Sequence, residues 1–146
     1  KYTISEANIV FHGDLVLNMK KANQFIVHCD YSNSGIALPN LSEVRKALDV
    51  DASTDFCIKI TVMGDLSNSN NFYIYGRNEL QDSSNATSWN IEDLPLITNW
   101  DGSNLNTMEM GSGDSVTFML IYDNTRTQTI GGFTTKYTAR IINRQY

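Results

Sequence analysis

Apolar and polar residues alternate along much of this chain with a period of two, which is the pattern of β-strands that bury one face. The longest run covers residues 133–141, where every second residue from Phe133 to Ile141 falls on one face. A second run, Ser115–Tyr122, precedes it, and a polar link that ends in Gly131 and Gly132 joins the two. We expect the two runs to pair as a hairpin with a long connection.

Shorter runs predict further strands, each bounded by Asn, Ser or Gly residues that favour turns. They cover residues 25–29, 36–38, 56–62 and 72–75, with a weaker candidate at 94–97. A chain of 146 residues is long enough for one domain with its own core. Several short strands at this spacing are typical of a β-sandwich or a β-barrel.

One segment departs from the period of two. Leu41, Val44 and Leu48 are spaced as on one face of a helix. Either Asn40 or Ser42 is suited to cap its first turn, because both residues carry a short side-chain oxygen. The pattern therefore predicts one short helix that crosses between strands.

Composition narrows the class of protein. The formal net charge is −5, and the 11 Lys and Arg residues are scattered along the chain, so nucleic acid is not an expected partner. No apolar stretch approaches the ~20 residues that cross a bilayer. Two cysteines, Cys29 and Cys57, suggest one disulfide in a secreted domain. The alternative is a pair of reduced core cysteines in a cytosolic protein.

Residues that carry chemistry are sparse. His12 and His28 each stand alone in a strand-like run, and no nucleophile elbow, zinc-protease, P-loop or dinucleotide motif is present. Asp49, Asp51 and Asp55 lack the Gly and the terminal Glu of a calcium-binding EF-hand loop, and a solvated turn explains them better. We therefore expect no catalytic residues, no metal and no cofactor, and we expect the protein not to be an enzyme.

Aromatic residues offer one possible ligand site. Trp89 and Trp100 anchor the polar region between the predicted strands, and Tyr73 and Tyr75 lie in a nearby strand. Their rings can stack on a sugar, although Trp and Tyr also serve as ordinary core or rim residues. Trp89 and Trp100 are the candidate ligand residues.

Several short motifs, spread over most of the chain, resemble those of one family. They are ANIVFHGDLV at residues 7–16, IALP at 36–39, FCIKI at 56–60, VTF at 116–118 and RQY at 144–146. This set of motifs resembles the type 1-like chaperone–usher pilins, which are the subunits of bacterial fimbriae.

The resemblance implies an all-β fold: an incomplete immunoglobulin-like β-sandwich that lacks its last strand and is completed by a donor strand from a neighbour. Residues 1–12 are then the N-terminal donor-strand extension, and residues 13–146 are the pilin domain. The donor residues, in two possible phases, are Tyr2, Ile4, Ala7, Ile9 and Phe11. The acceptor groove is expected to be lined by Phe118, Leu120, Phe133, Tyr137 and Ile141.

The resemblance also implies a function and a set of partners. The chain is expected to be a structural subunit of a surface fimbria that polymerises by donor-strand exchange and supports adhesion. Its partners are neighbouring pilin subunits, a periplasmic chaperone and an outer-membrane usher, and its location is the cell surface after passage through the periplasm. The alternative is a carbohydrate-binding β-sandwich, either a lectin or an adhesive pilin, whose ligand is a glycan or host receptor.

Overall fold

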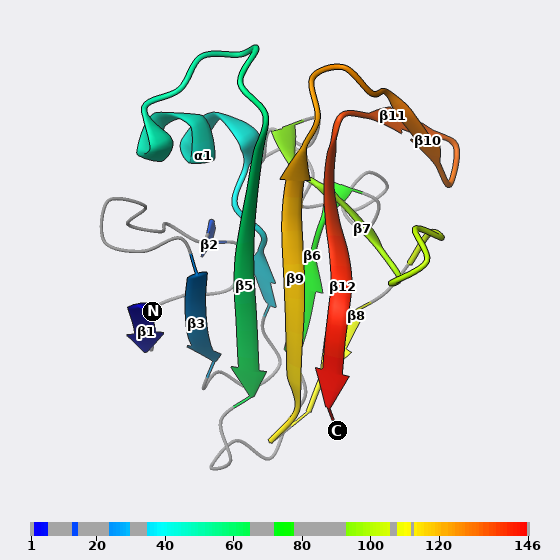
Figure 1. Cartoon of the computed structure of the whole chain (residues 1–146). Coiled ribbons are helices and arrows are strands. Elements are labelled where there is room, and N and C mark those ends of the chain that lie inside the picture. The colour runs from blue at the N-terminus through cyan, green and yellow to red at the C-terminus, as the bar shows by residue number, and fades with distance from the viewer. Residues whose placement is uncertain are drawn as a thin grey trace.

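The computed structural model describes residues 2–5, 13–14, 24–29, 35–64, 72–77, 93–105, 108–111 and 113–145, and it shows an all-β domain with one short helix (Figure 1). The six-stranded sheet has the order β1 (Tyr2–Ser5), β3 (Gln24–Cys29), β5 (Phe56–Gly64), β9 (Ser115–Tyr122), β12 (Tyr137–Gln145) and β7 (Leu96–Thr98). The four-stranded sheet has the order β2 (Gly13–Asp14), β4 (Gly35–Ala37), β6 (Phe72–Tyr75) and β8 (Met108–Met110). A separate two-stranded hairpin contains β10 (Gln128–Ile130) and β11 (Phe133–Thr135).

The first nine strands alternate between the two larger sheets, so that odd-numbered strands lie in one and even-numbered strands in the other. The neighbours β1–β3, β3–β5, β2–β4 and β4–β6 are each joined through one strand of the other sheet, and each of these pairs is parallel. An immunoglobulin-like sandwich is built from antiparallel sheets. The all-β class is confirmed. The parallel pairing in the first half of the chain differs from the expected immunoglobulin-like arrangement. The sequence did not predict this difference, because period-two patterning indicates which face of a strand is buried and not the direction in which the strand runs.

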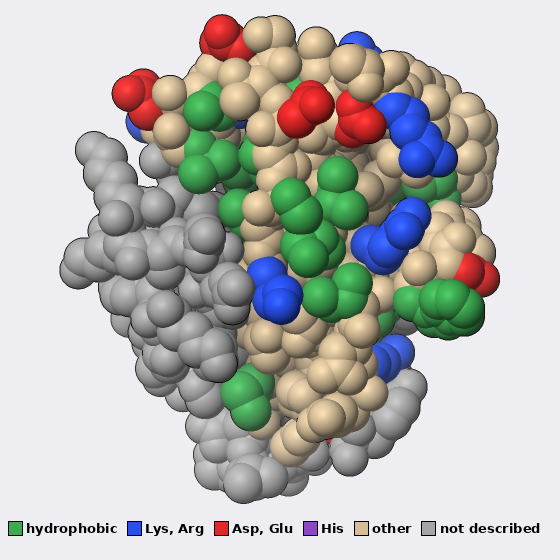
Figure 2. Space-filling model, viewed as in Figure 1, with side chains coloured by type: hydrophobic (Ala, Val, Ile, Leu, Met, Phe, Trp, Pro, Cys, Tyr) green, Lys and Arg blue, Asp and Glu red, His purple; other side chains and the backbone are tan. Residues whose placement is uncertain are grey.

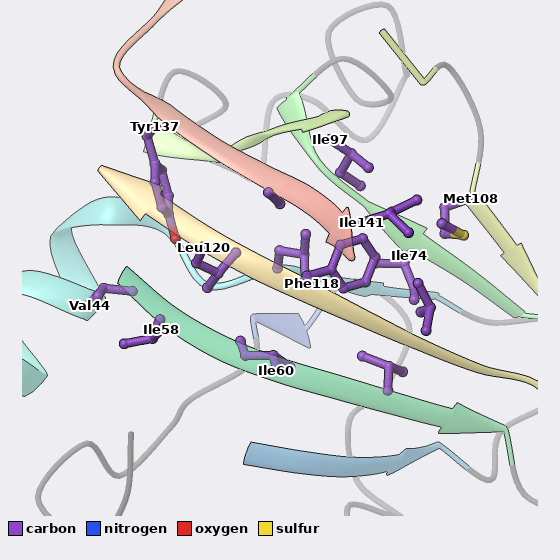
Figure 3. Close-up of a cluster of buried hydrophobic side chains, with 14 of the residues drawn as sticks. Val44, Ile58, Ile60, Ile74, Ile97, Met108, Phe118, Leu120, Tyr137 and Ile141 are labelled. Atoms are coloured by element: carbon purple, nitrogen blue, oxygen red, sulfur yellow. The ribbon is translucent and has the colours of Figure 1, made fainter. Parts of the chain in front are cut away.

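The core lies between the two sheets (Figure 3). Strand β5 buries Ile58, Ile60 and Val62 on its inner face, and β9 and β12 bury every second residue over most of their length in the same way. Phe118 of β9 is 0% exposed, and Ile74 of β6 meets this layer from the opposite sheet. Most of the hydrophobic stabilisation comes from such side chains, at about 1.5–3 kcal/mol for each one that is fully buried.

The predicted helix is confirmed as α1 (Leu41–Leu48). Its N-cap is Asn40, whose Oδ1 accepts a hydrogen bond of 2.8 Å from the backbone N–H of Glu43. Val44 is 1% exposed and belongs to the core, while Leu41 and Leu48 pack against the core from the same face. The helix ends at Asp49, which adopts the left-handed conformation with a φ of 56°.

Two of the predicted strands match the structure residue by residue, namely Ser115–Tyr122 and Phe72–Tyr75. The expected pairing of the last two runs is also confirmed, since β9 and β12 are antiparallel neighbours. The run at residues 133–141 is not continuous, because it is interrupted at Lys136 and its first part folds into the β10–β11 hairpin. Gly131 and Gly132 form the turn of that hairpin, with φ values of 58° and 84° that a type I′ turn requires.

Cys57 is a free, exposed thiol, whereas the side chain of Cys29, its expected disulfide partner, lies outside the described residues. The register of β3 on β5 sets the two positions apart, because Cys29 lies opposite Gly64, seven residues along the strand from Cys57. That spacing corresponds to about 23 Å, whereas disulfide-bonded residues have Cα atoms about 4.4–6.8 Å apart. The protein around Cys57 partly desolvates the thiol and raises its pKa.

In the described part of the chain, no helix has the length and apolar character needed to cross a membrane.

Candidate functional site

The two edges of the six-stranded sheet are the strongest candidates for a site, because the sequence predicts a protein that exchanges strands. One edge is β1 and the other is formed by β12 together with the short strand β7. In Figure 1 the central strands β5, β9 and β12 are long, and the strands outside them are short. An edge strand presents unpaired backbone groups to which another chain can add.

Four of the five predicted acceptor residues lie together in the core. Phe118 and Leu120 are 0% exposed, and Tyr137 and Ile141 are 3% and 8% exposed. The structure brings these four side chains into contact, but each is covered within the chain. Their role as the lining of an acceptor groove therefore stays a prediction.

The fifth predicted acceptor residue, Phe133, lies apart from that cluster in β11 and is half-buried. The guanidinium of Arg77 lies over its ring, with Cζ 5.6 Å from the ring centroid. Arg77 also donates a hydrogen bond of 3.0 Å from Nη1 to the carbonyl oxygen of Thr134. Phe133 thus helps to fasten the β10–β11 hairpin to the body of the domain.

The outer edge of β12 is only partly occupied. Strand β7 pairs in parallel with Thr138, Ala139 and Arg140, and no described strand pairs with the outer edge beyond Arg140. The register with β9 shifts between Ile141 and Asn143, so that Ile142 is the extra residue of a β-bulge. Ile142 is 42% exposed, which makes it an exposed apolar residue at an open edge.

A hydrogen bond links the far end of β12 to the second sheet. Arg144 donates it from Nη2 to the backbone carbonyl of Glu109 in β8, at 2.9 Å. The last residues of β12 are thus connected to both sheets, while the outer edge at Ile142 and Asn143 faces away from β9.

The predicted donor segment is described only in part. Tyr2 and Ile4 belong to β1, which pairs in parallel with β3 from Tyr2 opposite Phe25 to Ser5 opposite His28. Ala7, Ile9 and Phe11 lie outside the described residues. Among the described strands, the start of the extension therefore forms an edge strand of its own chain, paired with β3.

Comparisons with protein-family models, with curated proteins and with solved structures found no match.

Of the two predicted ligand residues, one lies beside the β7 edge and the other outside the described residues. Trp89 lies outside them, whereas Trp100 is 75% exposed in the loop after β7. Tyr73 and Tyr75 stack on one another in β6, with ring centroids 6.2 Å apart and an interplanar angle of 16°. Tyr73 is 36% exposed, so this sheet also presents an aromatic surface.

The acidic cluster after the helix is a turn. Oδ1 of Asp51 accepts hydrogen bonds from the backbone N–H and the Oγ of Ser53, at 2.9 and 2.6 Å. Asp55 accepts a bond of 2.8 Å from the backbone N–H of Asn124, which joins this loop to the end of β9. Within the described residues, no three His, Cys, Asp or Glu side chains are grouped as metal ligands.

The outward face of the central strands carries a mixture of apolar and basic side chains. Figure 2 shows hydrophobic side chains over β5, β9 and β12, with Lys and Arg side chains beside them. Register and burial assign Cys57, Lys59, Met119, Ile121 and Arg140 to this face. A strand that adds to β12 would extend this surface as well as the core.

Sequence reasoning missed the bulge at Ile142, and it located strand β7 (Leu96–Thr98) approximately, as the weaker candidate at residues 94–97. The signal for the bulge was the adjacent pair Ile141 and Ile142, which breaks the alternation of apolar and polar residues. Nothing in the sequence indicates that β7 pairs with only three residues of β12. The extent of an edge depends on tertiary pairing, which local pattern does not encode.

Proposed function

We propose that this chain is a structural subunit of a surface fimbria, which polymerises when the N-terminal segment of one copy adds to the β12 edge of the next. The observation that carries this proposal is the incomplete edge of β12, where Ile142 and Asn143 extend past the last residue that β7 pairs with. The donor and the acceptor lie at opposite edges of one sheet. Residues 1–12 serve as the donor extension, and residues 13–146 form the acceptor domain.

The strand directions support a continuous sheet between copies. Strands β1, β3 and β5 are mutually parallel, β9 runs opposite to them, and β12 is antiparallel to β9. Strand β12 therefore runs in the direction of β1. A copy of β1 can continue the parallel pairing that β7 begins, without a reversal of the incoming subunit.

Contacts between two different edges produce a fibre. An interface that joins unlike surfaces of identical subunits is heterologous, and it forms an open polymer unless the rotation between subunits closes a ring. Each copy in this arrangement uses one edge as donor and the other as acceptor. One kind of contact thus suffices for a filament of any length.

Exchange is feasible because β1 is a short edge strand. It contains four residues, and among the described strands it pairs with β3 alone. Release of β1 from β3 in its own chain frees a segment that can pair with another copy. The hydrogen bonds lost and gained are of the same kind, so the balance depends on side-chain burial and on subunit concentration.

Adhesion at the cell surface, passage through the periplasm and assembly by a chaperone and an usher are parts of the same proposal. They come from the resemblance to chaperone–usher pilins. Assembly of the kind described here requires an incomplete sheet edge and a mobile donor, and it does not require immunoglobulin-like strand order. An incomplete β-sandwich completed by a donor strand is the common element.

The test is the assembly state of three chains over a range of concentrations, measured by sedimentation velocity. The full chain is expected to form concentration-dependent polymers, and a chain without residues 1–12 is expected to stay monomeric. Ile142→Lys places a charge at the open edge, which opposes strand addition, and it should also abolish polymers. Thr129→Lys, at an exposed position of the β10–β11 hairpin, is the matched control and should polymerise normally.

A full chain that stays monomeric at every concentration, or polymers that persist in both the truncated chain and Ile142→Lys, would refute the proposal. Ile142→Lys keeps the test decisive if the truncated chain does not fold, because this substitution lies at an exposed side chain.

A further inference from the structure

Trp100 is the most exposed of the large hydrophobic side chains in the described part of the molecule, at 75%. A single exposed apolar residue is common on protein surfaces and needs no explanation by itself. The surroundings of Trp100 are what single it out. They consist of a rigid turn, a carboxylate and a guanidinium, none of which the assembly proposal uses.

The turn that carries Trp100 is closed by several hydrogen bonds. The backbone N–H of Asn99 donates to the carbonyl of Ser103, and the N–H of Gly102 donates to the carbonyl of Asn99, each at 2.9 Å. The side chain of Asn99 adds a bond of 3.0 Å from Nδ2 to the Oγ of Ser103. The backbone that presents the indole is thus fixed before any ligand arrives, which lowers the entropy lost on binding.

Asp101, the residue after Trp100 in the turn, supplies an acceptor. Its Oδ1 accepts bonds from the N–H and the Oγ of Ser103, at 3.0 and 2.7 Å, so Oδ2 is the oxygen left for other partners. These bonds, with a smaller contribution from the positive charge of Arg140, lower the pKa of Asp101. The carboxylate is therefore ionised at neutral pH and acts as an acceptor.

Arg140 supplies donors beside the same turn. It lies in β12 opposite Thr98, and its Nη2 is 3.1 Å from the point that a Cβ on Gly102 would occupy. The glycine, with a φ of 85°, leaves room for the guanidinium against the turn. Within the described part of the chain, no group accepts a hydrogen bond from this guanidinium, and Arg140 is partly exposed.

We propose that Trp100, Asp101 and Arg140 form a binding site for a neutral saccharide. The apolar face of a pyranose ring stacks on the indole, the carboxylate accepts from one ring hydroxyl, and the guanidinium donates to a neighbouring hydroxyl. An acidic sugar fits less well, because its carboxylate would face that of Asp101 on a chain of net charge −5. This site is independent of strand addition, since it uses neither β1 nor the edge at Ile142.

The test is binding of the full chain to an array of neutral, sialylated and sulfated glycans. Titrations with the methyl glycosides of glucose, galactose, mannose and N-acetylglucosamine follow. We expect binding to neutral glycans, weakened about tenfold or more by Trp100→Ala and by Arg140→Gln. Trp100→Phe keeps a ring and should retain part of the affinity.

Two controls separate this site from other aromatic and basic residues. Tyr73→Ala removes the exposed ring of the β6 pair, and Arg126→Gln removes an exposed guanidinium on a different turn. Both should bind as the unchanged chain does. All variants should melt within a few degrees of it and should polymerise as it does.

Three results would overturn the inference. The first is that the chain binds no glycan on the array. The second is that Tyr73→Ala abolishes binding while Trp100→Ala does not. The third is that the chain binds acidic glycans alone. The assembly measurement is unaffected by each of them, so failure of this site and failure of the proposed function are distinguishable.

Discussion

The centre and the edges of the six-stranded sheet are built in different ways. The central strands β5, β9 and β12 have eight or nine residues each, pair in antiparallel fashion and carry most of the core. The outermost strands β1 and β7 have four and three residues and pair in parallel. Stability is therefore concentrated at the centre of the sheet, and under the proposed function the short edges supply backbone groups to a second chain.

The largest loss of unfolding free energy is expected from a substitution that leaves a cavity beneath the central strands of the six-stranded sheet. Phe118→Ala removes a ring that is 0% exposed between β5 and β12, and such changes cost about 3–5 kcal/mol of unfolding free energy. Met119→Ala changes the next residue, which points to the outer face, and should cost about 1 kcal/mol or less. Urea denaturation measures both. Equal losses would mean that the inner and outer faces have been assigned incorrectly.

A smaller loss of unfolding free energy is expected when one buried hydroxyl, that of Tyr137, is removed. The Oη of Tyr137 donates a hydrogen bond of 2.7 Å to the carbonyl of Pro39, which joins β12 to the segment before the helix. Burial, with a contribution from Asp93, raises the pKa of Tyr137 well above its usual value, so the hydroxyl remains a donor. Tyr137→Phe leaves that carbonyl without this partner and should cost about 1–2 kcal/mol.

The control for that change is Tyr73→Phe, which removes the hydroxyl of an exposed tyrosine in the other sheet. Its thermal midpoint should match that of the unchanged chain. A Tyr137→Phe variant that melts at the same temperature as well would show that the link to Pro39 contributes nothing to stability.

Two carboxylates in the loops beside the sheet should make the free energy of unfolding depend modestly on pH. Hydrogen bonds from Ser53 lower the pKa of Asp51, and bonds from Thr125 lower that of Asp123, both from an ordinary value of 3.8. A lowered pKa in the folded state stabilises the fold above the unfolded pKa, and this contribution is lost as pH falls through the folded values. The free energy of unfolding should therefore decrease below about pH 4.

Replacing both residues, as Asp51→Asn with Asp123→Asn, keeps an acceptor oxygen in each turn and removes the titrating group. The slope of unfolding free energy against pH should become flatter in this acidic range. An unchanged slope would assign the acid sensitivity to other carboxylates.

The smallest effect on stability is expected at the open edge. Ile142→Lys changes an exposed side chain on the bulge and should alter the unfolding free energy by about 0.5 kcal/mol or less. A large loss of stability would show that Ile142 belongs to the packed centre. It would then no longer be an edge residue.

Sequence pattern predicted the centre well and the edges poorly. The alternation in β5, β6 and β9 and the capping residue Asn40 each identified an element, because these signals are local. The parallel pairing of β1 with β3 and the distance between Cys29 and Cys57 depend on register, which no local signal contains. Strand β8 was missed because its three residues lie in a polar region.

For the candidate site, too, local sequence signals predicted which residues are buried but not how the strands are arranged around them. Phe118, Leu120, Tyr137 and Ile141 were identified as one cluster because they alternate, and the structure places them together. Alternation indicates burial, but it does not distinguish a closed core from a groove that awaits a strand. The position of Arg140 beside the Trp100 turn was not predictable, because it depends on how β12 pairs with β7.

Hydrogen exchange on a chain without residues 1–12, with and without a peptide of that sequence, tests the central claim most directly. If the peptide completes the open edge, the amides at Ile142 and Asn143 of β12 become protected when it binds. Protection confined to Gln24–Cys29 of β3 would mean that the segment only restores its own edge strand. That result would contradict assembly by strand addition.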